Sequence, residues 1–186
     1  HRSDCCQDRL LGASVYVSTD ADYSAGTVCG PVDDQNGQPD TTECADVVGQ
    51  FVTVESTTSF ITICELEVMV NRGALNYAAG LPNGDCADVD GARVCGATSQ
   101  NSWGWGGEPG RAIDGNNNGA WGGGSCTHTQ SGSAAAPAWW QVDLGQVGSV
   151  DSVNLYHRSD CCQDRLLGAT VYVSATADYT AGTACG

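Results

Sequence analysis

The chain has 186 residues, a formal net charge of −15 and a sequence pI near 4.1. This excess of acid argues against nucleic acid and anionic membrane surfaces as partners, because both carry negative charge. Eleven cysteines indicate an oxidising setting, so we expect a secreted, extracellular protein. No apolar run reaches the length of a transmembrane helix, and we expect no membrane span.

One segment occurs twice in the chain. Residues 1–30 align without gaps with residues 157–186 and differ at five positions. The offset of 156 residues is about the length of one domain, which predicts a natural tandem repeat. We expect residues 1–73 to be the C-terminal half of one repeat and residues 74–186 the N-terminal two-thirds of the next.

Alternation of apolar and polar residues, typical of half-buried strands, recurs along the chain. The strands expected from it cover residues 10–18, 50–55, 59–70 and 149–157. Residues 30–43 are rich in turn-forming residues, and residues 86–95 contain an Asp- and Gly-rich insertion. We find no stretch with a 3.6-residue helical period, so the sequence predicts an all-β protein.

Residues 111–119 match the first half of a calcium-binding loop, with Asp114, Asn116 and Asn118 at alternate positions before Gly119. An EF-hand is excluded, because its twelfth position is Ser125 instead of Glu and no flanking helices are predicted. The loop still offers the oxygen ligands that a hard cation prefers. We favour a calcium site over the alternative, a plain Asx-turn loop.

The most informative stretch is residues 157–166, which hold two arginines around an acid and two adjacent cysteines. Two guanidinium groups suit carboxylate, phosphate or sugar hydroxyls, whereas the alternative is a surface ion-pair network. Neighbouring Cα atoms are about 3.8 Å apart, and ordinary disulfides need roughly 4.4–6.8 Å. Geometry therefore favours separate partners for Cys161 and Cys162. A bond between them would instead form a rigid apolar plate that suits the C–H face of a sugar.

This stretch resembles the signature of the F-type (fucose-binding) lectins, a histidine followed at a distance by R-x-D-x4-R/K with a Cys-Cys pair inside. Arg158, Asp160 and Arg165 fit the pattern, and the segment Cys126-Thr127-His128-Thr129 supplies the histidine. The Trp-Trp-Gln-Val-Asp-Leu-Gly run at 139–145 is also similar to a family motif. The resemblance implies an antiparallel β-sandwich of the jelly-roll type. The strands it implies are residues 60–68, 76–82 and 138–145.

The resemblance also implies two sets of functional residues. The implied sugar-binding residues are His128, Arg158, Asp160, Cys161, Cys162, Arg165 and Trp121. The first copy holds a partial set without the histidine, which comprises Arg2, Asp4, Cys5, Cys6 and Arg9. The implied Ca²⁺ ligands are Arg111 and Asn116 through their carbonyl groups, Asp114, Ser125 and Glu65. In this assignment the arginines and the histidine donate to L-fucose, and the cysteine plate and Trp121 cover its apolar side.

Five disulfides are expected. They are Cys5–Cys6, Cys29–Cys44, Cys86–Cys95, Cys161–Cys162 and Cys64–Cys126. The last pair joins different repeat units. It therefore implies one of two arrangements. Either residues 1–73 complete the domain formed by residues 74–156, within one chain or between chains, or the chain is part of a longer polymer of repeats. Cys185 is left without an expected partner.

The sequence favours a binding module over an enzyme, because it carries no nucleophile–base motif and no lysine. We predict a calcium-stabilised lectin whose partners are fucosylated glycans. The alternative is a structural repeat of an extracellular fibre or adhesin, with neighbouring repeats associated head to tail. Trp103 and Trp105 either stack on sugar or pack onto the sandwich, and the sequence does not decide between these roles.

Overall fold

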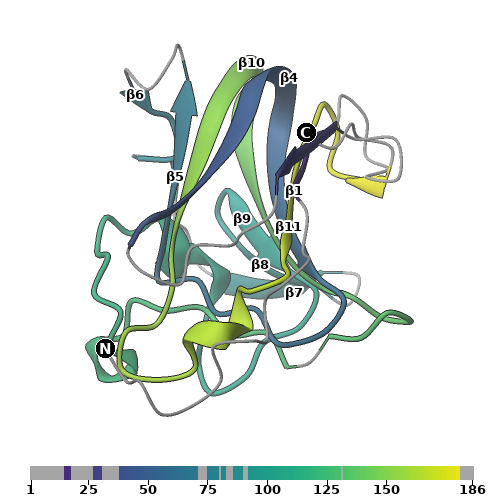
Figure 1. Ribbon diagram of the computed structural model, residues 1–186. Coiled ribbons are helices and arrows are strands. Elements are labelled where there is room, and N and C mark those ends of the chain that lie inside the picture. The colour runs from purple at the N-terminus through teal and green to yellow at the C-terminus, as the bar shows by residue number, and fades with distance from the viewer. Residues whose placement is uncertain are drawn as a thin grey trace.

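The structure is a computed structural model. It describes residues 15–17, 27–30, 38–70, 75–79, 81–82, 86–89, 92–130 and 132–180. These residues form antiparallel β-structure with three short 3-10 helices (Figure 1), which confirms the predicted fold class. Within the described part of the chain, we find no helix long and apolar enough to cross a bilayer.

Two long strands form the centre of the fold. β4 (Asp40–Ser56) and β10 (Ala138–Tyr156) run antiparallel along almost their whole length, from the pair Ala138–Ser56 to the pair Leu155–Asp40. The polar start of β4 hides its alternation, because the inward positions are Asp40, Thr42 and Cys44. The sequence therefore predicted a loop up to residue 43, and the strand begins earlier than expected.

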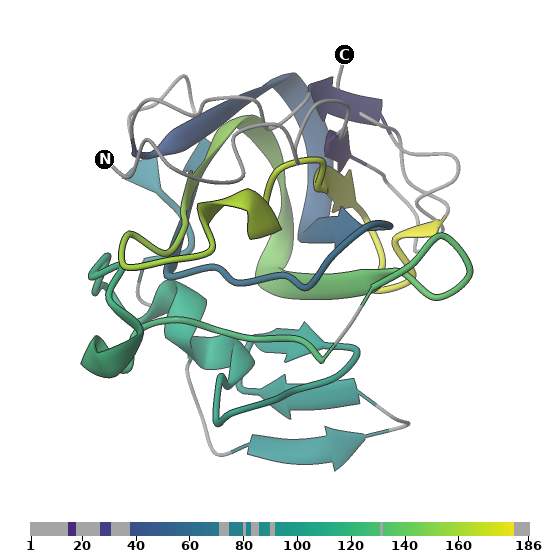
Figure 2. The same cartoon turned by 60° about the horizontal axis from the view of Figure 1, so that its bottom comes forward.

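The other strands add to the two halves of this central pair. The N-terminal half of β10 pairs with β9 (Thr98–Gln100), which continues into β8 (Ala92–Cys95) and β7 (Cys86–Val89), three neighbouring strands in Figure 2. The C-terminal half pairs with β5 (Glu65–Val70), and β6 (Leu75–Asn76) follows it. β11 (Thr170–Ser174) lies on the far side of β4, and β1 (Val15–Val17) pairs with β3 (Thr27–Gly30).

The central strands bend where the two halves meet, and glycine makes the bend possible. The pairing of β10 with β4 shifts register between Asp143 and Gly148, opposite Gly49. A Cβ atom on Gly49 would lie 2.4 Å from Val173 Cγ1, so no larger residue fits there. The bend lets one pair of strands contribute to both layers of the sandwich (Figure 1).

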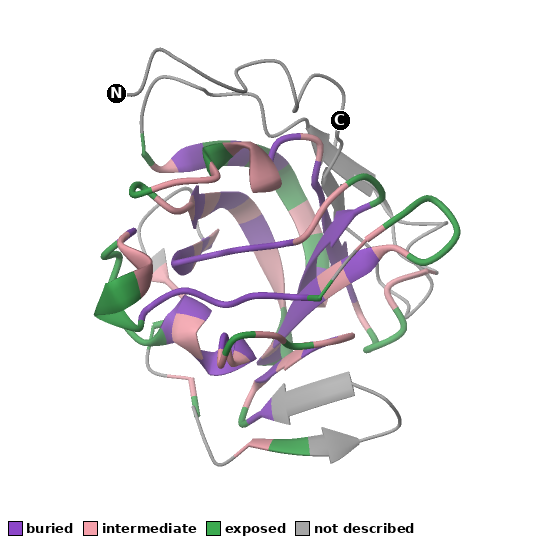
Figure 3. Ribbon diagram, turned by 90° about the horizontal axis from the view of Figure 1, so that it is seen from below, coloured by how far each residue is buried: buried purple, intermediate pink, exposed green. Residues whose placement is uncertain are grey.

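The core lies between the layers and is almost free of charge. Trp140, Leu155, Ile61 and Leu166 are among its fully buried side chains, and the buried positions follow the central strands in Figure 3. The indole Nε1 of Trp140 donates to the Pro109 carbonyl at 2.9 Å, which satisfies its only polar atom. Trp140 is therefore a core residue.

Both predicted parts of the chain contribute to one sheet. β4 and β5 precede the expected junction between residues 73 and 74, yet both pair with β10, which follows it. The Cys64–Cys126 disulfide joins the same two parts within one chain. The junction itself lies outside the described residues.

Three other expectations differ in detail. The strand expected at 60–68 begins only at Glu65. The backbones of Ile61 and Ile63 hydrogen-bond to the backbone N–H and the hydroxyl groups of Thr129 and Thr127, and so they do not form a regular strand ladder. The strand expected at 76–82 ends at Asn76. The insertion at 86–95 is a hairpin of β7 and β8, in which Cys86 stands opposite Cys95.

Candidate functional site

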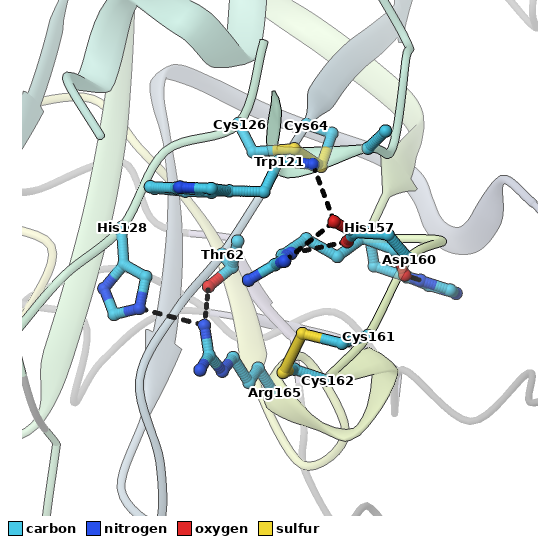
Figure 4. A network of polar contacts seen from close by, with 12 residues as sticks. Thr62, Cys64, Trp121, Cys126, His128, His157, Asp160, Cys161, Cys162 and Arg165 are labelled. Atoms are coloured by element: carbon cyan, nitrogen blue, oxygen red, sulfur yellow. Dashed lines mark hydrogen bonds and ion pairs between the residues drawn. A yellow bond between two sulfur atoms is a disulfide. The ribbon is translucent and has the colours of Figure 1, made fainter. Parts of the chain in front are cut away.

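Side chains from separate parts of the chain enclose a pocket of about 230 Å³. We call it the arginine pocket; it is lined by Trp105, Trp121, His128, Arg158 and Arg165. Figure 4 shows Trp121, His128 and Arg165 around one space. Trp121 lies in the 3-10 helix η2 (Trp121–Gly123), and Arg165 ends the 3-10 helix η3 (Gln163–Arg165). The fold thus brings together four residues of the predicted sugar-binding set.

Arg158 is held in place by Asp160. Its Nε and Nη2 atoms donate to the two carboxylate oxygens at 2.8 and 2.9 Å, a bidentate ion pair. Asp160 also accepts the backbone N–H of Trp121 at 3.0 Å. The hydrogen bond from Arg158 lowers the pKa of Asp160 to about 2, so the pair stays charged at neutral pH. The guanidinium lies over the Trp121 ring, 5.2 Å from its centroid.

His128 and Arg165 form the second polar contact of the pocket. Arg165 Nη1 lies 2.9 Å from His128 Nε2. A guanidinium can only donate, so Nε2 accepts and the ring proton lies on Nδ1, which donates to the Thr129 carbonyl. Burial lowers the pKa of His128, and the charges of Arg165 and Arg158 lower it further. His128 is therefore neutral at pH 7, and in this arrangement it orients Arg165.

Two residues that the sequence did not single out support Arg165. Its Nη1 atom donates to Thr62 Oγ1 at 3.3 Å, and its guanidinium lies over Phe60, 5.3 Å from the ring centroid. Phe60 also packs on His128 at 5.4 Å between ring centroids. Both supports come from the part of the chain before the predicted junction. Their alternate spacing, which puts them on one face of an extended segment, was the signal available in the sequence.

The Cys161–Cys162 disulfide is present in the structure, between Arg158 and Arg165 in the chain. Figure 4 places it beside Arg165. Cys162 adopts a left-handed backbone conformation with φ +57° and directly precedes η3. The cysteine pair therefore forms the turn from which Arg165 returns to the pocket.

Two tryptophans flank His128. The Trp121 ring meets the imidazole edge-on at 5.7 Å between centroids, and the Trp105 ring lies 4.7 Å away on a tilted plane. Trp121 was predicted as the apolar wall. Trp105 also lines the pocket although 73% of its surface is exposed, so packing onto the sandwich does not explain its position.

The predicted calcium ligands gather around a second site, which we call the acidic loop (residues 111–125 with Glu65). Glu65 is 5% exposed, and its Oε2 accepts the Gly115 N–H at 3.2 Å. Burial, followed by the charge of Asp114, raises the pKa of Glu65 to about 7. Burial also raises the pKa of Asp114. Two carboxylates thus repel one another at a partly buried position.

Hydrogen bonds within the acidic loop fix its course. The side-chain oxygens of Asp114, Asn116 and Asn118 each accept a backbone N–H two residues further on, at 2.9, 3.2 and 3.0 Å. The Ser125 hydroxyl donates to the Asn118 carbonyl. The Arg111 side chain points to the Cys126 carbonyl at 3.4 Å. Carboxylate, hydroxyl and carbonyl oxygens are the ligands that Ca²⁺ prefers, so these residues fit the predicted ion.

The disulfides Cys64–Cys126, Cys86–Cys95 and Cys161–Cys162 are all present in the structure. Cys44 is also disulfide-bonded, but the side chain of its predicted partner Cys29 lies outside the described residues. The remaining cysteines and the first copy of the signature lie outside them too. These residues are Arg2, Asp4, Cys5, Cys6, Arg9 and Cys185.

Comparison with known proteins gives partial but consistent matches. A family model described as a NedA-like, galactose-binding domain of the F5/F8 type C group matches residues 111–185. Fucolectin-4 of Anguilla japonica is 45% identical over 62 residues, which are 33% of this chain and 32% of that protein. Fucolectin of Anguilla anguilla is 44% identical over 66 residues, 36% and 40% of the two chains.

A pentraxin fusion protein of Xenopus laevis is 35% identical over 63 residues, which are 34% of this chain and 14% of that protein. No solved structure matches significantly. The chain spans about a third of the length of the fucolectins that it matches first. Residues 111–185 are therefore similar to a galactose-binding-like domain, and the antiparallel sandwich is consistent with this match. The identity to the eel fucolectins over this region supports an F-type lectin domain in the chain.

Proposed function

We propose that the arginine pocket binds a fucose-type sugar and that the protein is a lectin without catalytic activity. The observation that carries the proposal is the convergence of Arg158, Arg165 and His128 on one small pocket with an aromatic wall. Its volume of about 230 Å³ is below the range typical of drug-sized ligands, so a single sugar ring is a suitable occupant.

The donors left by the internal contacts support this proposal. Arg158 uses Nε and Nη2 on Asp160, which leaves Nη1 to donate to a hydroxyl group. Arg165 uses Nη1 on His128 and Thr62, which leaves Nη2 and Nε. Planar, pre-oriented donors bind vicinal hydroxyls at little entropic cost, because their geometry is already fixed.

The apolar side of the pocket suits a deoxy sugar. L-fucose carries a methyl group where related hexoses carry a hydroxymethyl group, and the Trp121 ring and the Cys161–Cys162 plate offer apolar surface beside the arginines. We assign the methyl group to this side. His128 donates to the sugar only if its proton moves from Nδ1 to Nε2; otherwise it acts by orienting Arg165.

We also propose that the acidic loop holds a calcium ion. Asp114, Glu65, Ser125 and the carbonyl groups of Arg111 and Asn116 would be its ligands. A bound cation neutralises the two carboxylates and ties η2, which carries Trp121, to the strand that begins at Glu65. The mutual repulsion of Glu65 and Asp114 favours this proposal over a plain turn.

The wider setting is part of the same proposal. The disulfides favour an extracellular protein, and fucosylated glycans are the proposed partners. The duplication of residues 1–30 at 157–186 favours tandem repeats that associate head to tail, as in a filament or adhesin. Several repeats would raise the avidity for a glycan surface without any change in the single pocket.

Calorimetric titration of L-fucose tests the sugar assignment. We expect saturable binding for the wild type and a loss of about 100-fold for Arg158→Ala or Arg165→Ala, because each removes charge-assisted hydrogen bonds. Arg158→Lys keeps the positive charge but loses the planar guanidinium with its paired donors, so it should also weaken binding. Gln146→Ala, an exposed change distant in sequence from the pocket residues, serves as the control. Unchanged affinity in a folded Arg158→Ala variant would disprove the assignment.

A further inference from the structure

Trp105 stands out among the pocket residues because it is both exposed and conformationally strained. Its side chain is 73% exposed, the highest value among the large exposed apolar residues of the described chain. Its backbone has φ +50°, in the left-handed region that residues other than glycine and asparagine seldom adopt. A tryptophan held in solvent in this conformation requires an explanation, because burial of its ring would be favourable.

The backbone around Trp105 is anchored to the His128 segment. The Gly104 N–H donates to the His128 carbonyl, and the His128 N–H donates to the Gly107 carbonyl, both at 3.0 Å. Gln100, which is fully buried, adds a bond from Nε2 to the Gly107 carbonyl at 3.0 Å. These contacts fix the loop on both sides of Trp105.

Close packing fixes the loop further. A Cβ atom on Gly107 would lie 2.4 Å from the backbone nitrogen of His128, so the two backbones meet at a distance that only glycine permits. Gln130 also binds this loop, donating from Nε2 to the Trp103 carbonyl at 3.0 Å. The exposure of Trp105 is therefore imposed by its loop and does not reflect a lack of structure.

The indole of Trp105 belongs both to the pocket wall and to the exposed surface. Its ring is 4.7 Å from the His128 ring and lines the arginine pocket, yet most of its surface faces solvent. A single sugar in a pocket of about 230 Å³ has little use for that remaining surface. A second sugar ring, joined to the first, would lie over it with its C–H face on the indole.

We propose that Trp105 is a platform for the sugar next to the fucose, so that the preferred ligand is a fucosylated oligosaccharide instead of the free monosaccharide. The inference rests on the proposed function of the arginine pocket. It assigns the arginines to the first ring and the indole to the second.

The test compares two ligands on the same set of variants. Methyl α-L-fucoside and fucosyl disaccharides in each of the common linkages are titrated, and the ratio of their affinities is recorded. We expect at least one disaccharide to bind the wild type about three- to tenfold more tightly than the monosaccharide, the range of an aromatic stacking contact. Trp105→Asn should lower the ratio to about one, with a larger loss for the disaccharide than for the monosaccharide; the fold should be kept, because asparagine tolerates the left-handed backbone.

Two controls make the result specific. Trp105→Phe should retain most of the preference, and Trp103→Ala, which removes a less exposed tryptophan of the same loop, should leave it unchanged. An equal loss for both ligands in Trp105→Asn would place Trp105 in the monosaccharide site and overturn the inference. An unchanged ratio, or no disaccharide preference in the wild type, would overturn it too. Failure of the wild type to bind either ligand would instead disprove the proposed function.

Discussion

The arginine pocket and the acidic loop lie close together in the chain, but their charged groups have opposite surroundings: they are paired in the pocket and repel one another in the loop. In the pocket each charged group has a fixed protein contact: Arg158 pairs with Asp160, and Arg165 bonds to His128. In the acidic loop burial, followed by repulsion from Asp114, raises the pKa of Glu65 to about 7. The pocket is thus held by protein contacts alone, whereas the loop gains most from a cation. We infer that the ion stabilises the fold and that the pocket itself binds the sugar.

The Cys64–Cys126 disulfide joins the two regions, which also meet at Trp121, whose backbone N–H donates to Asp160. Cys64, which is bonded to Cys126, precedes Glu65 of the acidic loop in the chain. It follows Phe60 and Thr62, which support Arg165 in the pocket. Any change at this disulfide should therefore reach both regions, while a change to a side chain that serves one region should act mainly on that region.

The largest effect is expected from removal of the joining disulfide. Cys64→Ala with Cys126→Ala opens a link between residues 62 apart, which should lower the free energy of unfolding by about 2–5 kcal/mol. Sugar affinity and the response to calcium should both fall, because the link supports both sites. Denaturant unfolding and calorimetry would measure these changes.

The hairpin disulfide provides the matched control. Cys86–Cys95 closes a separation of only 9 residues, so its removal should cost roughly 1.5 kcal/mol less and spare sugar affinity. An equal effect of both double variants on sugar binding would refute the special position of Cys64–Cys126.

Calcium removal should act mainly on stability. At a concentration 100 times its dissociation constant, a bound ion adds about 2.7 kcal/mol to the free energy of unfolding, which EDTA would remove. Glu65→Gln should abolish the response to calcium. Without the ion it should be at least as stable as the wild type, because its repulsion with Asp114 is gone. Thermal unfolding with and without EDTA checks both points; a full calcium response in Glu65→Gln would exclude Glu65 as a ligand.

Loss of the Asp160 carboxylate, which holds Arg158, should act mainly on the pocket. Asp160→Asn releases Arg158 from its bidentate pair, and re-ordering the guanidinium on binding should cost about 0.5–1.5 kcal/mol, or roughly three- to tenfold in sugar affinity. The calcium-dependent shift in unfolding temperature should be unchanged. A lost calcium response in this variant would mean that the two regions are not separable.

The smallest effect concerns pH. The pKa of His128 lies below its usual 6.5, mainly because of burial, so the fold favours the neutral ring. The stability that this residue contributes is complete above pH 6.5 and is lost as the pH falls below that value. Sugar affinity should follow, because protonated His128 cannot accept from Arg165.

Asp160 should not interfere with this pH dependence. Its pKa of about 2 keeps it charged throughout the range, and its own contribution is lost only as the pH falls from 3.8 toward 2. His128→Gln should therefore flatten the affinity profile between pH 5 and 8. A profile that is already flat in the wild type would contradict the role of neutral His128.

Sequence motifs predicted the pocket better than they predicted its supports. The sequence indicated four of the pocket residues because each belongs to a short motif of characteristic residues, and the fold brings them together. They are His128, Arg158, Arg165 and Trp121. Phe60 and Thr62 have no such mark, since their alternation is equally typical of a buried strand. The position of the Trp105 ring at the pocket depends on a left-handed backbone conformation. A glycine in the sequence would indicate that conformation, whereas a tryptophan does not.

The strands were predicted where apolar residues alternate and missed where polar residues face inward. The first residues of β4 place Asp40 and Thr42 inside, so composition indicated a loop. The β7–β8 hairpin did carry a local signal, because Asp90-Gly91 between two short alternating runs is typical of a two-residue hairpin turn. The pairing of strands from either side of the predicted junction is a long-range property, and no local pattern indicates it.

Titration of L-fucose in calcium and again in EDTA, with the unfolding temperature followed in parallel, tests the central claim most directly. We predict saturable binding in both conditions, with affinities within a few-fold of each other, and a lower unfolding temperature in EDTA. Absence of binding by a folded, calcium-loaded protein would contradict the sugar assignment. Complete loss of binding in EDTA, at a temperature where the protein remains folded, would show that the pocket depends on the ion and would contradict the separation of the two regions.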